Sequence, residues 1–182
     1  MDRKKLLKCL KEYWLKNNIP NITSENASFL CNLIKENKVK NMLEIWTANW
    51  FSAICFWIEL EKSNWKLTSI EFSENSFKQA IKNIKEASLE ETVTLINDNA
   101  LDLIPKLKEK YDFVFIDGMK RRTKDFLELV WCKLTSPSII VIDDVIKFKE
   151  KMVGLYEFLK EKNIDYEIIP IDKDDGIMLI KK

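Results

Sequence analysis

Short apolar segments alternate with amphipathic segments along most of this chain, and this alternation constrains the fold more than any other feature. Several apolar segments, such as FVFI at 113–116, are hydrophobic at every position instead of every second one. Continuous apolar strands are typical of a parallel sheet that helices cover on both faces. The expected strands are NMLEI (41–45), KLTSIEF (66–72), TVTLIN (92–97), YDFVFID (111–117), SIIVIDDV (138–145), DYEIIPI (165–171) and GIMLIKK (176–182).

Helical periodicity fills the intervals between these strands. Helices are expected over residues 2–17, 24–38, 51–62, 74–87, 101–109, 122–133 and 148–162. Only residues 172–175 separate the last two strands, so these form an antiparallel hairpin. We therefore predict an α/β fold, a Rossmann-like doubly wound seven-stranded sheet, mostly parallel with an antiparallel C-terminal strand and with helices on both faces. Residues 1–182 are expected to form a single domain, with N-terminal helices in 1–38 and a ligand-binding core in 39–182.

Composition excludes several kinds of chemistry. The chain has no histidine, which rules out Ser-His and Cys-His nucleophiles and histidine–zinc centres. A net charge of +1 gives no overall attraction to nucleic acid, and no apolar run is long enough to span a membrane. The cysteines form no C-x-x-C pair and are interpreted as reduced packing residues of a cytoplasmic protein. They are Cys9, Cys31, Cys55 and Cys132.

Three acids end two of the predicted strands. Asp117 ends the fourth strand, and Asp143 and Asp144 end the fifth. Doubly wound sheets bind ligands beyond the carboxyl ends of their strands, where the strand order reverses. If the two strands are neighbours, the three carboxylates converge, and an oxygen-only site suits a hard cation such as Mg²⁺, Mn²⁺ or Ca²⁺. The alternative is that these acids cap the segments that follow them.

Two more charged residues follow strand ends. Glu71 ends the second strand, where doubly wound folds place a carboxylate that binds the ribose of a nucleoside ligand. Its alternative role is to cap the helix that begins near Ser73. Lys120 follows Asp117 by three residues, and a lysine beside a cation is a candidate general base. Otherwise Lys120 is an exposed member of the basic run KRRTK (120–124), which could contact RNA phosphate.

Four motifs together resemble those of one family. In order along the chain they are LEIWTANWFS (43–52), SIEFSENSF (69–77), FIDGMK (115–120) and VIDDV (141–145). They are similar to the motifs of the cation-dependent O-methyltransferases, the S-adenosylmethionine (SAM) family that includes catechol and caffeoyl-CoA O-methyltransferases and bacterial relatives. The resemblance extends from about residue 18 to the end of the chain.

This resemblance implies SAM as the cofactor and a divalent cation, Mg²⁺ first and Mn²⁺ or Ca²⁺ otherwise. It implies that Asp117, Asp143 and Asp144 hold the cation. It also implies that Lys120 and Asp117 are the catalytic residues, with Lys120 as the base. The implied cofactor-binding residues are Glu44, Trp46, Thr47, Trp50, Ser52, Glu71, Asn99, Ala100 and Asp117. The acceptor would be a hydroxyl of a small catechol-like molecule. Relatives are often dimers, so a homodimer is one expected assembly, and no membrane partner is expected.

Tryptophan replaces glycine in the first motif. Trp46 and Trp50 stand where the family has glycines that let the backbone approach SAM, and Trp65 stands where relatives often have a glycine turn. The chain has six tryptophans and three glycines. Three explanations compete: a degenerate paralogue that has lost SAM binding, a rearranged loop whose tryptophans line a modified pocket, and UGA codons that the natural lineage reads as glycine.

Three functions therefore follow from the sequence. The first is a SAM- and cation-dependent O-methyltransferase. The second is a catalytically impaired protein of the same fold with a binding or structural role, because Trp46 and Trp50 block the SAM loop. The third is a tRNA hydroxyuridine O-methyltransferase, in which phosphate contacts come from Lys120, Arg121, Arg122 and Lys124.

Overall fold

The computed structural model describes residues 8, 12, 16, 22–46, 52, 55, 56 and 65–182. The strands are β1 (Asn41–Ile45), β2 (Lys66–Glu71), β3 (Val93–Asn97), β4 (Tyr111–Ile116), β5 (Leu134–Ile142), β6 (Glu167–Pro170) and β7 (Gly176–Lys181). The α-helices are α2 (Ser24–Glu36), α4 (Glu74–Ala87), α5 (Ala100–Leu103), α6 (Thr123–Trp131) and α7 (Val153–Glu161). Short 3-10 helices are η1 (Ile104–Lys106), η2 (Lys120–Arg122) and η3 (Lys149–Met152).

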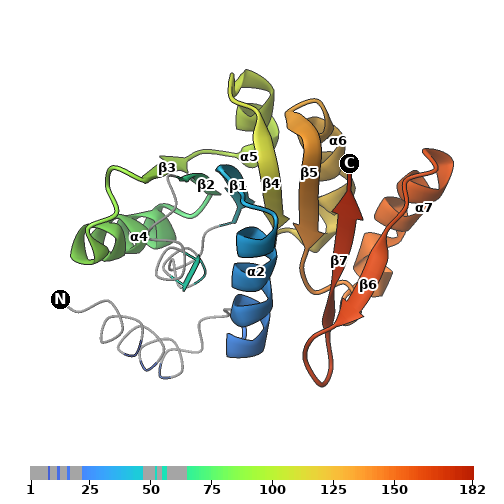
Figure 1. Ribbon diagram of the computed structural model, residues 1–182, viewed down its shortest axis with the longest axis horizontal. Coiled ribbons are helices and arrows are strands. Elements are labelled where there is room, and N and C mark those ends of the chain that lie inside the picture. Colours follow the sequence, from blue (N-terminus) through green and yellow to red (C-terminus); the bar gives the residue numbers. More distant parts are fainter. Residues whose placement is uncertain are drawn as a thin grey trace.

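The strands form one sheet in the order β3-β2-β1-β4-β5-β7-β6 (Figure 1). β1 pairs in parallel with β2 and β4, and the pairs β2–β3 and β4–β5 are also parallel. β7 runs antiparallel to both β5 and β6. The predicted seven-stranded, mostly parallel sheet with an antiparallel C-terminal strand is confirmed. Its strand order reverses between β1 and β4, so a ligand site is expected at the carboxyl ends of these two strands.

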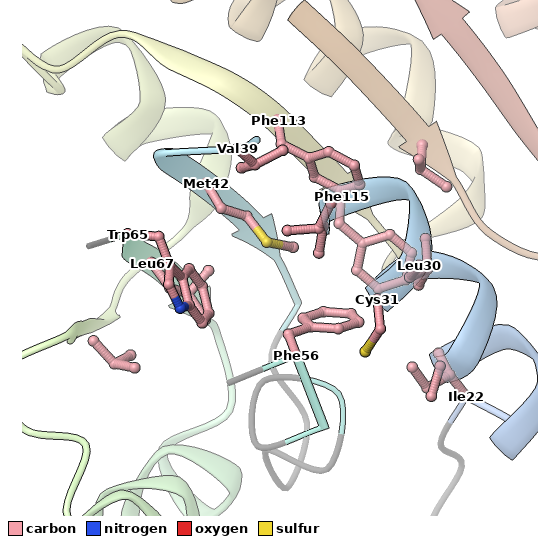
Figure 2. Close-up of a cluster of buried hydrophobic side chains, with 14 of the residues drawn as sticks. Ile22, Leu30, Cys31, Val39, Met42, Phe56, Trp65, Leu67, Phe113 and Phe115 are labelled. Carbon is pink, nitrogen blue, oxygen red and sulfur yellow. The ribbon is translucent and has the colours of Figure 1, made fainter. Parts of the chain in front are cut away.

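Helices cover both faces of the sheet, which explains why the strands are apolar at every position. Successive residues of β4 point to opposite faces: Phe113 and Phe115 join one buried cluster, and Val114 and Ile116 join the other. The first cluster includes buried residues of α2, among them Leu30 and Cys31 (Figure 2), and of α4. The second includes buried residues of α6 and α7. The two cores hold the strand ends in fixed positions at the edge where ligands bind.

Several element ends differ from the predicted ones. The helix predicted over 101–109 is shortened to α5 and η1, because Pro105 lacks the N–H that would continue an α-helix. The strand predicted over 138–145 begins earlier, at Leu134, and ends at Ile142. It ends there because the backbone of Asp144 has a φ of 61° and leaves the sheet. The strand predicted over 165–171 is reduced to β6.

Some predictions concern residues that the structure does not describe. The helices predicted over 2–17 and 51–62, and Cys9, lie largely or wholly outside the described residues. Cys31 is buried, whereas Cys132 is exposed at the end of α6, so the interpretation of Cys132 as a packing residue is wrong. In the part of the chain that the structure describes, no helix has the length and apolar character needed to cross a bilayer.

Candidate functional site

The site lies where the strand order reverses. The N–H of Trp46, just after β1, donates to the carbonyl of Ile70 in β2 at 2.9 Å. The N–H of Asp117, just after β4, donates to the carbonyl of Ile45 at 3.2 Å. These bonds continue the sheet by one residue on each side of the reversal. They place Trp46 and Asp117 next to each other at the ligand-binding edge.

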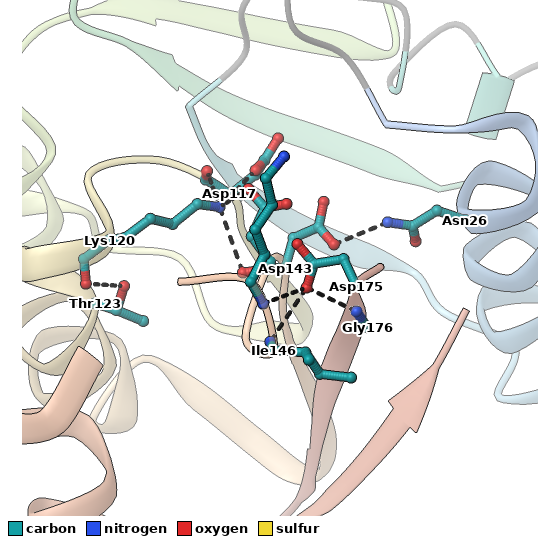
Figure 3. A network of polar contacts seen from close by, with 10 residues as sticks. Asn26, Asp117, Lys120, Thr123, Asp143, Ile146, Asp175 and Gly176 are labelled. Carbon is teal, nitrogen blue, oxygen red and sulfur yellow. Dashed lines mark hydrogen bonds and ion pairs between the residues drawn. The ribbon is translucent and has the colours of Figure 1, made fainter. Parts of the chain in front are cut away.

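A lysine ammonium lies among the acids that follow β4 and β5 (Figure 3). The Nζ atom of Lys120 is 3.0 Å from Oδ1 of Asp117 and 2.7 Å from Oδ2 of Asp144. It also donates to the backbone carbonyls of Asp117 at 2.7 Å and Asp143 at 3.3 Å. The structure therefore brings the four residues Asp117, Lys120, Asp143 and Asp144 together, because β4 and β5 are neighbours. We call these four residues the acidic centre.

Burial makes the charges of this centre depend on one another. Burial first, and the charge of Asp117 next, raise the pKa of the Asp143 carboxyl to about 8. Burial also raises the pKa of Asp117 and Asp144, while the charge of Lys120 opposes the rise. Burial alone would lower the pKa of Lys120, but the surrounding carboxylates outweigh it and raise that pKa. Lys120 is therefore a protonated ammonium whose positive charge offsets the negative charges of the carboxylates.

The donor atoms of the acidic centre suit a hard cation, since they are carboxylate oxygens. Among the described residues, no three His, Cys, Asp or Glu side chains converge on a metal-binding position, because the Lys120 ammonium lies between the acids. Within the described residues, one buried oxygen beside the centre, Oδ2 of Asp175, has no hydrogen-bond partner. A buried acceptor without a donor is destabilising, and a cation would satisfy it. The donor atoms therefore fit a divalent cation, and the Lys120 ammonium would have to leave its position between the acids for one to bind.

Two residues of this region were missed from the sequence. Asn26, in the first turn of α2, is 3% exposed, and its Nδ2 donates to Oδ1 of Asp143 at 2.8 Å. The sequence places Asn26 only within the helix expected over 24–38, and in the structure it follows the N-cap Thr23 by three residues. Asp175 had appeared only as a hairpin turn residue. The signal for Asp175 is its place just before β7, because an antiparallel β7 beside β5 brings its first residues to the end of β5.

A cleft lies at the carboxyl ends of β1, β2 and β3. Its volume is about 160 Å³, and it is lined by three of the predicted cofactor-binding residues, Trp46, Asn99 and Ala100. Asn99 also caps α5, because its Oδ1 accepts from the N–H of Leu101 at 3.1 Å. The other lining residues are Ile45, Ile70, Phe72, Asp98, Leu101, Met119, Arg122 and Phe126. Small-molecule pockets are usually about 300–1,000 Å³, so this cleft is too small for an entire SAM molecule.

Trp46 lines this cleft with a side chain where the family has glycine. Its φ is 82°, a conformation that favours glycine. A Cβ added to Gly118 would collide with the Trp46 indole, so the indole lies directly on the Gly118 backbone beside the acidic centre. Trp65 is different: it is 2% exposed in the core, and its indole N–H has no hydrogen-bond partner within the described structure. Thr47 and Trp50 lie outside the described residues.

Three of the remaining predicted cofactor residues, Glu44, Ser52 and Glu71, are buried. Glu44 is fully buried, and its two carboxylate oxygens accept from the hydroxyls of Ser52 and Ser69, each at 2.6 Å. Ser69 was not predicted. Glu71 is also buried, and its Oε1 accepts from the N–H of Ser73 at 2.7 Å. Glu71 thus supports the start of α4, as the alternative interpretation expected, at the strand end where a ribose would bind.

Replacement of Glu44 by glutamine should change how stability depends on pH. Burial raises the pKa of Glu44 from 4.5 to about 7, although Ser52 and Ser69 lower it. The folded protein therefore binds the Glu44 proton more tightly than the unfolded chain does. This proton contributes to the free energy of unfolding fully below about pH 4.5, and its contribution is lost as the pH rises through about 7. The loss is on the order of 3 kcal/mol.

Glu44→Gln keeps the shape and can bond both serines, so its stability should fall less than that of the wild type between pH 5 and pH 8. Urea unfolding at the two pH values measures the difference. Since Asp117, Asp143 and Asp144 titrate in both proteins, the comparison isolates Glu44. Equal pH dependence in the two proteins would contradict a buried, proton-binding Glu44.

The basic run at 120–124 is mostly engaged in local ion pairs. Lys120 belongs to the acidic centre, Arg122 Nε is 2.5 Å from Oδ2 of Asp125, and Lys124 Nζ is 3.6 Å from Oε2 of Glu128. Arg121 is exposed. These pairings reduce the number of cations that the run offers to a phosphate backbone.

The fold and the site together define a class of protein, a Rossmann-like domain with a cleft next to an acid–lysine centre. The family model described as O-methyltransferase matches residues 1–182. The chain is 30% identical to a catechol O-methyltransferase of Niastella koreensis over 132 residues, which cover 69% of this chain and 58% of that protein. It is 26% identical to a catechol O-methyltransferase of Mycobacterium tuberculosis over 128 residues, with 69% and 57% covered. The chain belongs to the O-methyltransferase family.

Solved structures agree with this fold. A Staphylococcus aureus protein provisionally assigned as a caffeoyl-CoA O-methyltransferase has a TM-score of 0.86 at 25% identity, with 97% of this chain and 92% of that chain covered. An O-methyltransferase of Bacillus cereus in complex with SAH has a TM-score of 0.85 at 22% identity, with 98% and 91% covered. The described chain therefore shares nearly the whole fold of these proteins, whereas it spans less than two thirds of the two catechol O-methyltransferases.

Proposed function

We propose that this protein is a SAM-dependent O-methyltransferase that uses a divalent cation to methylate a hydroxyl of a small catechol-like acceptor. The observation that carries the proposal is the acidic centre at the reversal of the strand order. Its carboxylates and Lys120 lie next to Gly118 and the cleft that contains Asn99 and Ala100. A methyl donor in the cleft would therefore lie beside an acceptor at the acidic centre, and positioning of the two reactants supplies much of the rate in such reactions.

Each residue of the site has a role in this proposal. Asp117, Asp143 and Asp144 would hold the cation, and Lys120 would accept the proton of the acceptor hydroxyl. When bound, the cation supplies positive charge that lowers the pKa of the acceptor and compensates the acids that keep Lys120 protonated. Asn99 and Ala100 would contact the adenine of SAM, Glu71 its ribose, and Glu44, Thr47 and Ser52 its methionine end.

Trp46 favours a second candidate function, a protein of this family that has lost catalysis and acts by binding. The indole lies on Gly118 and lines a cleft of about 160 Å³, and in this proposal the methionine end of SAM would have to pass it. The two candidates differ in whether SAM enters when the indole is present. The tRNA substrate stays a third hypothesis, with salt-dependent tRNA binding as its test.

The full chain should methylate catechol from SAM in the presence of Mg²⁺, slowly if Trp46 limits SAM entry. Product is measured by mass spectrometry, with a parallel reaction in EDTA. We expect EDTA to abolish the product and excess Mg²⁺ to restore it. Product that is insensitive to EDTA would contradict the cation. Absence of product from both the wild type and Trp46→Gly, with both proteins folded, would contradict the enzyme and favour the binding protein.

A further inference from the structure

Asp175 links the backbone after β5, at residues 146–147, to the β6–β7 hairpin through hydrogen bonds. Its Oδ1 accepts backbone N–H groups of Ile146 at 3.1 Å, Lys147 at 3.2 Å and Gly176 at 2.7 Å (Figure 3). The N–H of Val145 also donates to the carbonyl of Gly176 at 3.0 Å. The backbone after β5 is thereby fixed where Asp144, with its φ of 61°, leaves the strand and meets Lys120.

The second oxygen of Asp175 faces the acidic centre. Within the described residues, Oδ2 is buried and has no hydrogen-bond partner. The charge of Asp175 also acts on Asp117. Among the described residues, Lys120 is the lysine that pairs with these acids, through Asp117 and Asp144. A buried carboxylate oxygen in such a position needs more positive charge than one lysine supplies.

Asn26 contacts the same acids from α2. This side chain is 3% exposed, and its Nδ2 donates to Oδ1 of Asp143 at 2.8 Å, so its amide nitrogen faces the acids (Figure 3). Asp143 is therefore held from α2, whereas Asp175 lies on the hairpin. Neither Asn26 nor Asp175 belongs to the three acids that the sequence assigns to the cation.

We propose that Asp175 is a fourth acid of the cation site: one oxygen positions the backbone that carries Asp144, and the other adds its negative charge to the site. This inference rests on the cation part of the proposed function. A purely structural Asp175 would need only the oxygen that accepts the three N–H groups.

The substitution Asp175→Asn separates the positioning role of Asp175 from its negative charge. Asp175→Asn keeps an oxygen for the three N–H groups, and its new amide can donate to Asp144, so the folded protein should keep or gain thermal stability. It removes one negative charge, however, and the affinity for a divalent cation depends on the charge of the ligand set. Asp175→Ala removes both roles and should lower the melting temperature as well.

The test is a calorimetric titration of the full chain with Mn²⁺, together with thermal melts of the same samples. We expect Asp175→Asn to bind Mn²⁺ roughly tenfold more weakly than the wild type without a loss of melting temperature. The control is Asp174→Asn, which removes the same charge from an exposed neighbour and should leave the affinity unchanged. Equal affinity of Asp175→Asn and the wild type would overturn this inference and leave the proposed function intact. A wild type that binds no Mn²⁺ would overturn both.

Discussion

Trp46→Gly should bind SAM on the order of 100-fold more tightly than the wild type. For SAM to enter, the indole must leave Gly118 and the cleft, which exposes on the order of 100 Å² of apolar surface and costs about 2.5 kcal/mol. Glycine removes this cost and also suits the φ of 82° at this position, where a side chain is strained by about 1–2 kcal/mol. Calorimetric titration with SAM in the presence of Mg²⁺ measures the affinity.

Two further variants test the physical reason. Trp131→Gly removes another half-buried tryptophan, outside the cleft, and should leave SAM affinity unchanged. Gly118→Ala should destabilise the wild type, because its Cβ collides with the indole, and should be tolerated in the Trp46→Gly background. If neither Trp46→Gly nor the double variant with Trp50→Gly binds SAM while folded, the cleft is not a SAM site. Tight binding by the wild type would instead show that the loop moves.

The three explanations for the tryptophans make different statements about the gene. UGG codons at positions 46, 50 and 65 would exclude decoding as glycine. The conformation of Trp46 fits any explanation in which this position was once glycine, since the backbone has kept a conformation that glycine adopts without strain. Trp65 adds a buried indole N–H that has no partner among the described residues, which is unusual for a tryptophan selected for its packing. Position 46 is therefore the most informative of the three.

The sheet was predictable because local sequence determines its character. Strands such as FVFI at 113–116 are apolar at every position only if both faces are covered, and the short link 172–175 permits only a hairpin. Element ends were less predictable, because they depend on single residues. Pro105 ends the regular part of α5, and Asp144 ends β5 by adopting a left-handed conformation that its sequence context does not specify.

The centre of the site was visible in the sequence, whereas its surroundings were not. Asp117 and Lys120 are three residues apart, so their proximity follows from a short motif. Asn26 is 117 residues from the aspartate it contacts, and Asp175 is 28 or more residues from the N–H groups after β5. Such contacts depend on the order of the strands and on where α2 packs, which no local pattern encodes. The position of Lys120 between the acids, as their counter-ion, also depends on the pairing of β4 with β5 and not on a local pattern.

Lys120→Met should remove most methyl transfer and also destabilise the folded protein. Loss of a general base lowers a rate by about 10²–10⁴-fold. Loss of the ammonium leaves Asp117, Asp143 and Asp144 without their counter-charge, and breaking a buried ion pair by removing one partner costs about 3–5 kcal/mol. Added Mn²⁺ or Mg²⁺ should recover part of this stability, since a cation takes the place of the ammonium. Product formation and urea unfolding, each with and without the cation, measure the two effects.

Lys120→Arg separates the charge of the lysine from its ability to accept a proton. Arginine keeps a positive charge among the carboxylates, so stability should stay close to that of the wild type. It stays protonated at all physiological pH values, so it cannot act as a base, and methyl transfer should still be lost. Lys124→Met, which removes a lysine from an exposed pair with Glu128, should change neither quantity. An active Lys120→Arg enzyme would mean that the lysine serves only as a counter-ion, and that the acceptor loses its proton to another group.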